Sequence, residues 1–417
     1  MPIERLRDAY KHLRRGIPVV LAVSVGVLFL EWAGFFRTLQ DLALITFQVL
    51  DTGHTESAIT IVEISDGLFD DKNFAFKGQY PLAAGGVKDI IVAIAKGKPK
   101  VIGIDLNTAQ WLGSDLDDLK RRLTELQNQA PLIWARDMVS VGGSRQYCVG
   151  STAGNNGLYD RYTGIAAVPA DWDGVVRRYH RVLPVLGLCS DASEREMIQS
   201  FPWAVATLVE QGVPAEKVRA PDATELVLNF YGDRFNFRPL PAEAALKQAD
   251  EPGWAVDGAV TGRIALIGGS YHAAHDVQVT PVGIRSGAQI VAQAIQSELS
   301  GRGVHPFDAV RMTLVEAFLG FLLIGVHTLL SGIKALIATG VLFLGIAFGG
   351  SELTYSSYAQ WVDCIPMLIA VVFHEFYHQA KTDRKELNLL RKAQHSPQAL
   401  GAKGQDRRPE SEAPSMH

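Results

Sequence analysis

The sequence predicts an α/β domain, with a mostly parallel sheet and flanking helices, joined to four transmembrane helices. Two observations predict this arrangement. Strand-like and helix-like segments alternate through the middle of the 417-residue chain, which is typical of a parallel sheet covered by helices. Four apolar stretches frame that middle part, one near the start and three near the end. They leave roughly 270 residues between the first and the second, enough for one sizeable domain.

The elements of the middle part are predicted from side-chain periodicity. Runs of β-branched residues predict strands at Ala58–Ile64 and Lys100–Leu106, because a strand buried on both faces is apolar throughout. Apolar residues spaced along one face predict helices at Ala83–Ala95 and Leu116–Gln127. The remaining predictions are strands at Pro131–Arg136, Thr224–Phe230 and Arg263–Gly268, a strand pair or one long strand over Val175–Leu186, and helices at Ser193–Gln211 and Ala288–Glu298.

The four apolar stretches approach the length of a membrane-spanning helix, which needs about 20 residues to cross ~30 Å of hydrocarbon. We predict transmembrane helices at residues 17–36, 310–330, 333–350 and 359–378. Small residues such as Gly325 and Gly340 would let the second and third pack closely as a hairpin. A cleaved signal peptide is the alternative for the first, but no small-residue cleavage site follows it.

Basic residues predict the orientation of these helices. Five lysines and arginines precede the first helix within residues 1–16, and five follow the last within residues 379–394. The positive-inside rule therefore places both ends of the chain in the cytoplasm. The domain at residues 37–309 would lie outside the cytoplasm, so we expect a multi-pass protein of a bacterial plasma (inner) membrane, with a periplasmic domain in a Gram-negative cell. Residues 379–417 would form a cytoplasmic tail, partly helical and then disordered.

Charge and cysteine content restrict the classes of partner. The net charge of −4 and the absence of a basic face argue against a nucleic-acid partner. Cys148 and Cys189 both fall in the outer domain, where a disulfide between them would close a loop of about 40 residues and contribute ~3 kcal/mol. Two buried, unbonded thiols are the alternative. Neither cysteine has the spacing of a metal site, and we expect no cofactor.

Polar side chains follow the predicted parallel strands, at the sheet edge where ligands bind in open α/β folds. Two of them, Asp66 and Asp105, lie at the ends of the first two strands, and a second group follows the glycine-ended strand. The candidate ligand-binding residues are Asp66, Asp105, Ser270, Tyr271, His272, Asp276 and Thr280. The alternative is that the aspartates cap helices or brace loops. No nucleophile–base pair accompanies them, so we assign no catalytic residue.

One motif points toward an enzyme. The segment His374-Glu375-Phe376-Tyr377-His378 has the H-E-x-x-H pattern, which places two imidazoles one helical turn apart as in zinc hydrolases. His327, at a similar predicted depth, is a third weak metal-ligand candidate beside His374 and His378. Aromatic residues and histidines also gather at membrane interfaces as anchors, and we favour that interpretation. A membrane-edge metallohydrolase is kept as the last-ranked alternative.

Three segments of the middle part match motifs of one family. Residues 262–295 read GRIALIGGSYHAAHDVQVTPVGIRSGAQIVAQAI, with Gly268, Asp276, Thr280, Pro281 and Gly287 at its signature positions. Residues 171–185, DWDGVVRRYHRVLPV, and residues 103–106, GIDL, are similar to its central motif and its second strand. Over about residues 51–301 the chain thus resembles the CHASE type 2 (CHASE2) sensory domains of bacterial receptors. It departs at residues 78–82, GQYPL, where the family usually carries a tryptophan–proline–arginine cluster.

The resemblance implies an extracytoplasmic sensor of signal transduction. Only about 40 residues follow the last predicted helix, too few to fold an enzyme domain, so we expect no fused output enzyme. The expected partners are therefore a separate cytoplasmic signalling protein, membrane lipid, and a second copy of the chain paired through the tail helix. The competing hypothesis is a scaffold that binds an envelope protein and senses nothing.

Overall fold

The computed structural model describes residues 57–108, 111, 114–126, 129–136, 138–140, 147–149, 162–186, 196–212, 225–230, 237–300, 304–306, 309–330, 333–350, 353–355, 360–361 and 384–391, with single positions before residue 46. The chain divides into two compact units. One comprises Met1–Gln40, Asp308–Ala347 and Asp363–His417, and the other comprises Asp41–Phe307 and Phe348–Val362. The second unit thus combines a long continuous stretch with a short segment from late in the sequence.

The second unit is built on a six-stranded sheet with the order β11-β1-β12-β2-β3-β6. Its strands are β1 (Ile59–Ile64), β2 (Val101–Asp105), β3 (Leu132–Arg136), β6 (Thr163–Ile165), β11 (Arg238–Pro241) and β12 (Ile264–Gly269). Every neighbouring pair is parallel. The predicted α/β class with a mostly parallel sheet is therefore confirmed.

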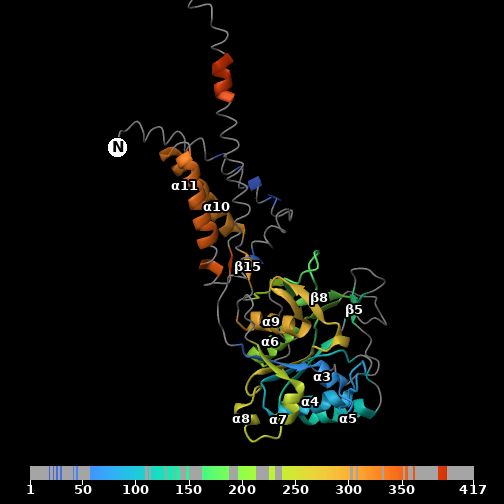
Figure 1. Cartoon of the computed structure of the whole chain (residues 1–417). Helices are drawn as coiled ribbons and strands as arrows, with labels where there is room; N and C mark the ends of the chain where they lie inside the picture. Colours follow the sequence, from blue (N-terminus) through green and yellow to red (C-terminus); the bar gives the residue numbers. More distant parts are fainter. Residues whose placement is uncertain are drawn as a thin grey trace, which may run out of the picture. The chain divides into compact units, whose positions relative to one another are not determined.

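Helices cover both faces of this sheet (Figure 1). On one face lie α3 (Asp66–Asp70), α4 (Ala84–Lys96), α5 (Ser114–Leu126), α7 (Ala242–Gln248) and α8 (Trp254–Asp257), and on the other lie α6 (Phe201–Gln211) and α9 (Gly287–Leu299). Alternate residues of β1 serve the two faces, since Val62 packs in the α4 core and Ile61 in the α9 core. Because both faces of β1 are covered, its run of mostly apolar residues predicted the strand correctly.

Five two-stranded sheets surround the central one. They pair β4 (Met138–Ser140) with β5 (Tyr147–Val149), β7 (Arg178–His180) with β10 (Glu225–Val227), β8 (Val182–Val185) with β9 (Glu196–Gln199), β13 (Val277–Thr280) with β14 (Gly283–Ser286), and β15 (His305–Pro306) with β16 (Gln360–Trp361). Over Val175–Leu186 the predicted segment is two strands, and each pairs with a partner from elsewhere in the chain.

The predicted helix at Ser193–Gln211 is wrong in its first part. Residues 196–199 form β9, and α6 begins only at Phe201. The hydroxyl of Ser200 accepts a hydrogen bond from the backbone N–H of Trp203, and proline follows in the first turn. A serine cap followed by proline is a strong helix start, and it separates the helix from the strand before it.

The first unit contains two described helices, α10 (Ala309–Leu329) and α11 (Ile333–Leu344). The π-helical residues Gly345–Gly350 follow α11, and the last three of them belong to the second unit. Residues 384–391 are also helical. Within the described ranges, no helix has both the length and the apolar character required to cross a membrane. The four transmembrane helices therefore stay a prediction, and most of the fourth, at 359–378, lies outside the described residues.

Candidate functional site

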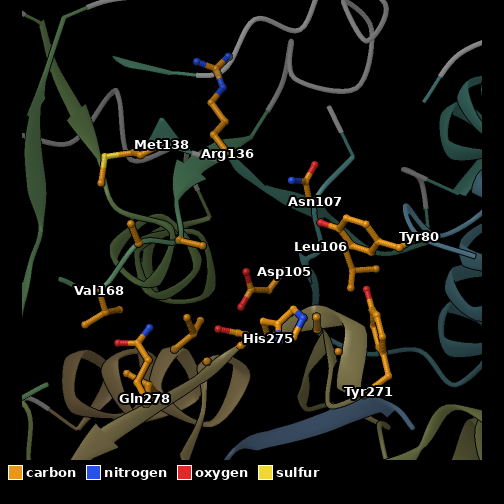
Figure 2. Close-up of a pocket in the computed structure, with 18 residues that line it drawn as sticks. Tyr80, Asp105, Leu106, Asn107, Arg136, Met138, Val168, Tyr271, His275 and Gln278 are labelled. Atoms are coloured by element: carbon orange, nitrogen blue, oxygen red, sulfur yellow. The ribbon is translucent and has the colours of Figure 1, made fainter. Parts of the chain in front are cut away.

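A cavity of about 340 Å³ lies at the carboxyl ends of the central strands (Figure 2). The chain leaves β2 toward α5 on one face of the sheet and leaves β12 toward α9 on the other. Because β2 and β12 are neighbours, their diverging connections open a crevice between them. The cavity thus occupies the position at which open α/β sheets bind ligands.

The cavity lining comes from the ends of four parallel strands, from the segment after β12 and from the start of α9. It comprises Tyr80, Asp105, Leu106, Asn107, Arg136, Met138, Ala166, Ala167, Val168, Gly269, Tyr271, Ala274, His275, Asp276, Gln278, Gly287, Ile290 and Val291. Figure 2 shows the carboxylate of Asp105 near the middle of these side chains, whereas the guanidinium of Arg136 extends away from it. The lining of the cavity therefore combines acidic and amide groups with apolar side chains.

Tyr271 forms an aromatic wall of the cavity. Its buried ring stacks on Phe69, with 4.5 Å between ring centroids and 13° between ring planes. Burial, and to a smaller extent the nearby Tyr80 and Asp276, raises the pKa of Tyr271 to about 12, so its hydroxyl is neutral at physiological pH. A Cβ atom at Gly269 would lie 2.5 Å from this ring. Glycine at the end of β12 is therefore what lets the tyrosine fold back over the strand.

Asp276 and Gly287 form the polar end of the cavity. A Cβ atom at Gly287 would lie 2.1 Å from Oδ2 of Asp276, so only glycine leaves room for this carboxyl group at the start of α9. Burial raises the pKa of Asp276, while a hydrogen bond from the backbone N–H of Gly287 opposes that rise. Ser286 and Gln289 cap the same helix end with a reciprocal pair of hydrogen bonds. The spacing of aspartate and glycine in the sequence thus has a steric reason.

Three of the seven predicted ligand-binding residues line the cavity: Asp105, Tyr271 and Asp276. The other four, Asp66, Ser270, His272 and Thr280, are not in the lining and make hydrogen bonds outside it. Asp66 accepts a hydrogen bond from the backbone N–H of His272 at 2.7 Å, and its Oδ1 lies 2.7 Å from Nδ1 of the same residue, an arrangement that lowers the pKa of Asp66. Ser270 donates to the carbonyl of Ile64, and Thr280 donates to the carbonyl of Gly283 within the hairpin.

Arg136, Tyr80 and Gln278 are lining residues that sequence reasoning missed. Arg136 ends β3, so the criterion that selected Asp105 at the end of β2 would also have selected it. Gln278 alternates with exposed valines in β13, which is a recognisable strand pattern. Nothing in the sequence around Tyr80 signals its position at the cavity.

The central motif of residues 171–178 forms an ion-pair cluster. Arg177 makes two hydrogen bonds of 2.8 Å to Asp173, and it also contacts Asp171 at 3.3 Å. Arg178 contacts Asp171 at 2.5 Å, and it also pairs with Asp41. A third carboxylate, that of Glu225 in β10, lies 3.2 Å from Nε of Arg178. Through Arg178 the motif therefore connects Asp41, the first residue of the second unit, to strands β7 and β10.

The cysteine and metal predictions reach only partly into the described residues. Cys148 of β5 is disulfide-bonded, and Cys189, its predicted partner, lies outside them. His327 belongs to α10, whereas His374 and His378 of the H-E-x-x-H segment are also outside. Among the residues that the structure describes, no group of three or more histidine, cysteine or acidic side chains could hold a metal ion.

A three-layer α/β domain with a crevice at its topological switch point has the architecture in which open α/β sheets commonly bind ligands. A family model for the CHASE2 domain matches residues 17–331. The chain therefore belongs to the CHASE2 family, whose domains are extracytoplasmic and sensory rather than catalytic. No curated protein and no solved structure matches the chain.

Proposed function

We propose that this chain is a membrane-bound sensor whose extracytoplasmic domain binds a small polar molecule in the cavity between β2 and β12. The signal would pass to a separate cytoplasmic signalling protein. One observation carries this proposal: the cavity lies at the switch point of the sheet, in a domain of a sensory family. A receptor responds only when its ligand prefers one of two arrangements, so the ligand must contact elements that can shift.

The lining suggests the chemistry of the ligand. Asp105, Asn107 and Gln278 offer hydrogen-bonding groups, while Ile290 and Val291 of α9 form an apolar surface. A volume of about 340 Å³ is at the small end of the range for ligand sites, about 300–1,000 Å³. These features favour a metabolite-sized polar molecule with an apolar side over a lipid or a peptide.

A contact within the second unit supports the predicted topology. Tyr355, from the segment between the third and fourth predicted transmembrane helices, is buried in the unit that contains the cavity. Residues 351–360 are predicted to lie on the same side of the membrane as the domain at 37–309. A buried contact between the two requires that they share one side, as four membrane crossings would give.

Thermal unfolding of the full-length chain in detergent tests the ligand proposal. A panel of amino acids, organic acids and monosaccharides is screened, and a ligand present at 100 times its Kd should add about 2.7 kcal/mol. That gain corresponds to a rise in Tm of roughly 5–10 °C. Ala167→Trp, which fills the cavity, should abolish the rise, and Asp117→Asn on the exposed face of α5 should leave it unchanged. A flat response to the whole panel contradicts the proposal.

A second candidate function, a scaffold for an envelope protein, is favoured by one exposed surface. Val277 and Ile284 are 67% and 68% exposed, and Val279, directly opposite Ile284 in the β13–β14 hairpin, is also exposed. Apolar side chains gathered on one strand face often mark a protein contact. Under this alternative no small molecule raises Tm, and Ile284→Lys removes a co-purifying envelope protein.

A further inference from the structure

A series of buried polar contacts passes through Asn229, which lies two residues after the end of β10. The side-chain Nε2 of Gln293 in α9 donates a hydrogen bond to the backbone carbonyl of Asn229. The hydroxyl of Tyr355 donates a hydrogen bond of 2.7 Å to Oδ1 of the same asparagine. Each of the three residues is only 2% exposed. Water therefore does not compete for these contacts, and the three residues are connected through the backbone and the side chain of Asn229.

The two outer residues of this series of contacts, Gln293 and Tyr355, lie in different parts of the second unit. Gln293 lies within one helical turn of Ile290 and Val291, and those two residues line the cavity. Tyr355 belongs to the segment Phe348–Val362, which joins the second unit from late in the sequence. Its ring packs with Leu44 and Val304 in a small buried cluster beside Val227 of β10. The cavity helix is thus connected, through one asparagine, to a segment between two predicted transmembrane helices.

A second series of contacts runs from the cavity to Asp41, the first residue of the second unit. The backbone N–H of Val176 donates a hydrogen bond of 2.8 Å to the carbonyl of Val279, in the strand that carries the lining residue Gln278. Val176 is followed by the arginines of the ion-pair cluster, and Arg178 pairs with the buried Asp41. Asp41 lies a few residues after the first predicted transmembrane helix. Both predicted membrane-proximal segments are therefore connected to the cavity lining through an intervening segment: Asn229 for residues 348–362, and residues 176–178 for Asp41.

Buried polar groups make such a link discrete. A shift of α9 that separated Gln293 from Asn229 would break a buried hydrogen bond, which is costly. The alternatives are that Asn229 and Tyr355 move with the helix or that the whole contact opens. In both cases a displacement at the cavity changes the environment of residues 348–362.

We propose that Asn229 is the coupling residue of this domain: it transmits displacement of α9 at the cavity to the segment at residues 348–362 through Tyr355. The inference rests on the proposed ligand cavity and adds the route by which its state leaves the domain. Arg178 and Asp41 provide a parallel connection to the predicted first transmembrane helix. The tyrosine hydroxyl is the contact that can be removed with the least change in shape, because Tyr355→Phe keeps the ring in its apolar cluster.

Hydrogen–deuterium exchange of the full-length chain in lipid nanodiscs tests this coupling. Gly287→Ala serves as the cavity perturbation, since its Cβ atom would lie 2.1 Å from Oδ2 of Asp276 and must displace either that carboxyl group or the start of α9. We expect it to change exchange in residues 348–362 by at least about threefold, as loss of one ordinary hydrogen bond would. In the Tyr355→Phe background the same perturbation should change exchange in that segment by less than twofold.

Two further variants make the result decisive. Gly97→Ala strains the opposite side of the sheet, where its Cβ atom would lie 2.4 Å from Cγ2 of Val260, and it should leave residues 348–362 unchanged. If Gly287→Ala does not fold, Gln293→Leu replaces it, because it removes the donor to Asn229 without adding volume at the cavity. Equal responses with and without the Tyr355 hydroxyl overturn the proposal, as does the absence of any response to both perturbations.

The outcome is separable from that of the proposed function. If a small molecule raises Tm but residues 348–362 respond equally in Tyr355→Phe, the ligand site stands and the coupling route is wrong. If the coupling is measured but no molecule in the panel binds, the proposed ligand class fails and the mechanical connection stands.

Discussion

The two sides of the central sheet differ in what their buried contacts are made of. On the α4 side the core consists of apolar side chains, and the buried indole N–H groups of Trp111 and Trp254 donate to the backbone carbonyls of Leu82 and Ala93. On the α9 side an apolar core of similar extent also contains buried side-chain hydrogen bonds. These involve Asn229, Gln293, Ser297 and the pair Arg181–Glu298.

This difference predicts which side of the sheet keeps a fixed arrangement and which side can change. Apolar packing is non-directional, so the α4 side, apart from the side-chain hydrogen bonds of Thr60, Trp111 and Trp254, can absorb small shifts without losing a specific contact. A buried hydrogen bond or ion pair is either made or broken, and a side built from such contacts has discrete arrangements. We therefore expect the α4 side to act as a fixed frame and the α9 side to change when the cavity is occupied. Three substitutions, taken from the largest expected effect to the smallest, examine this contrast.

Arg181→Met should have the largest effect on stability. Its guanidinium makes two hydrogen bonds, of 2.6 and 2.8 Å, to the carboxylate of Glu298, which is only 5% exposed. Burial raises the pKa of Glu298 to about 8, so the carboxyl group left without arginine takes up a proton at neutral pH. That protonation limits the loss to about 3 kcal/mol, the low end for a broken buried pair. Urea unfolding of the full-length chain measures it.

The double variant Arg181→Met with Glu298→Leu shows whether charge causes this loss. Replacing both partners of a buried pair by apolar residues is often neutral, so we expect the double variant to regain most of the stability. Arg181 also lies over the ring of Trp203, 5.0 Å from its centroid. If the double variant is as unstable as the single one, packing against this ring accounts for the loss, and the contrast between the two sides weakens.

Ile91→Val on the α4 side should cost about 1 kcal/mol, the usual effect of removing one buried methylene group. Ile91 is fully buried in α4, within the apolar core on that side of the sheet. The loss should therefore be the same at pH 5 and pH 8, and at low and high salt, when it is measured by urea unfolding. A loss that varies with pH by as much as its own size would show that this side also depends on charge.

Much of the fold could be predicted from the sequence because its central strands are long and apolar. Five of the six residues of β1 and four of the five residues of β2 are buried, as expected for strands covered on both faces. The three-residue strands β4, β5 and β6 offer too few residues for any periodicity to appear. The predicted helix at Ser193–Gln211 included residues 196–199, which instead pair with β8 from a separate part of the chain.

The candidate site was predicted only in part, for a related reason. Asp105 and Asp276 were found because strand ends and glycines mark their positions along the chain. The pairs that connect the cavity to distant segments have no such mark. Arg178 and Asp41 are 137 residues apart, and Tyr355 and Asn229 are 126 residues apart. Contacts of this kind depend on how the finished domain brings loops together, so one sequence does not reveal them.

Asp173→Asn should have an effect no larger than that of Ile91→Val, and the effect should depend on pH. Hydrogen bonds from Arg177 lower the pKa of Asp173 from 3.8 to about 2. A carboxyl group with a lowered pKa adds stability above its ordinary pKa and loses that contribution as the pH falls through its folded value. Because Asp173 is partly exposed, solvent screening limits the contribution to about 1 kcal/mol.

We therefore expect wild type to exceed Asp173→Asn in Tm by about 2–4 °C at pH 6. The difference should shrink steadily from pH 4 and vanish near pH 2, with ionic strength held constant. Ile91→Val, which removes no charge, should keep a constant difference over the same range and serves as the control. A difference for Asp173→Asn that does not change down to pH 2 would mean that the ion pair with Arg177 contributes no stability. The ion-pair cluster would then position Asp41 without adding to the stability of the domain.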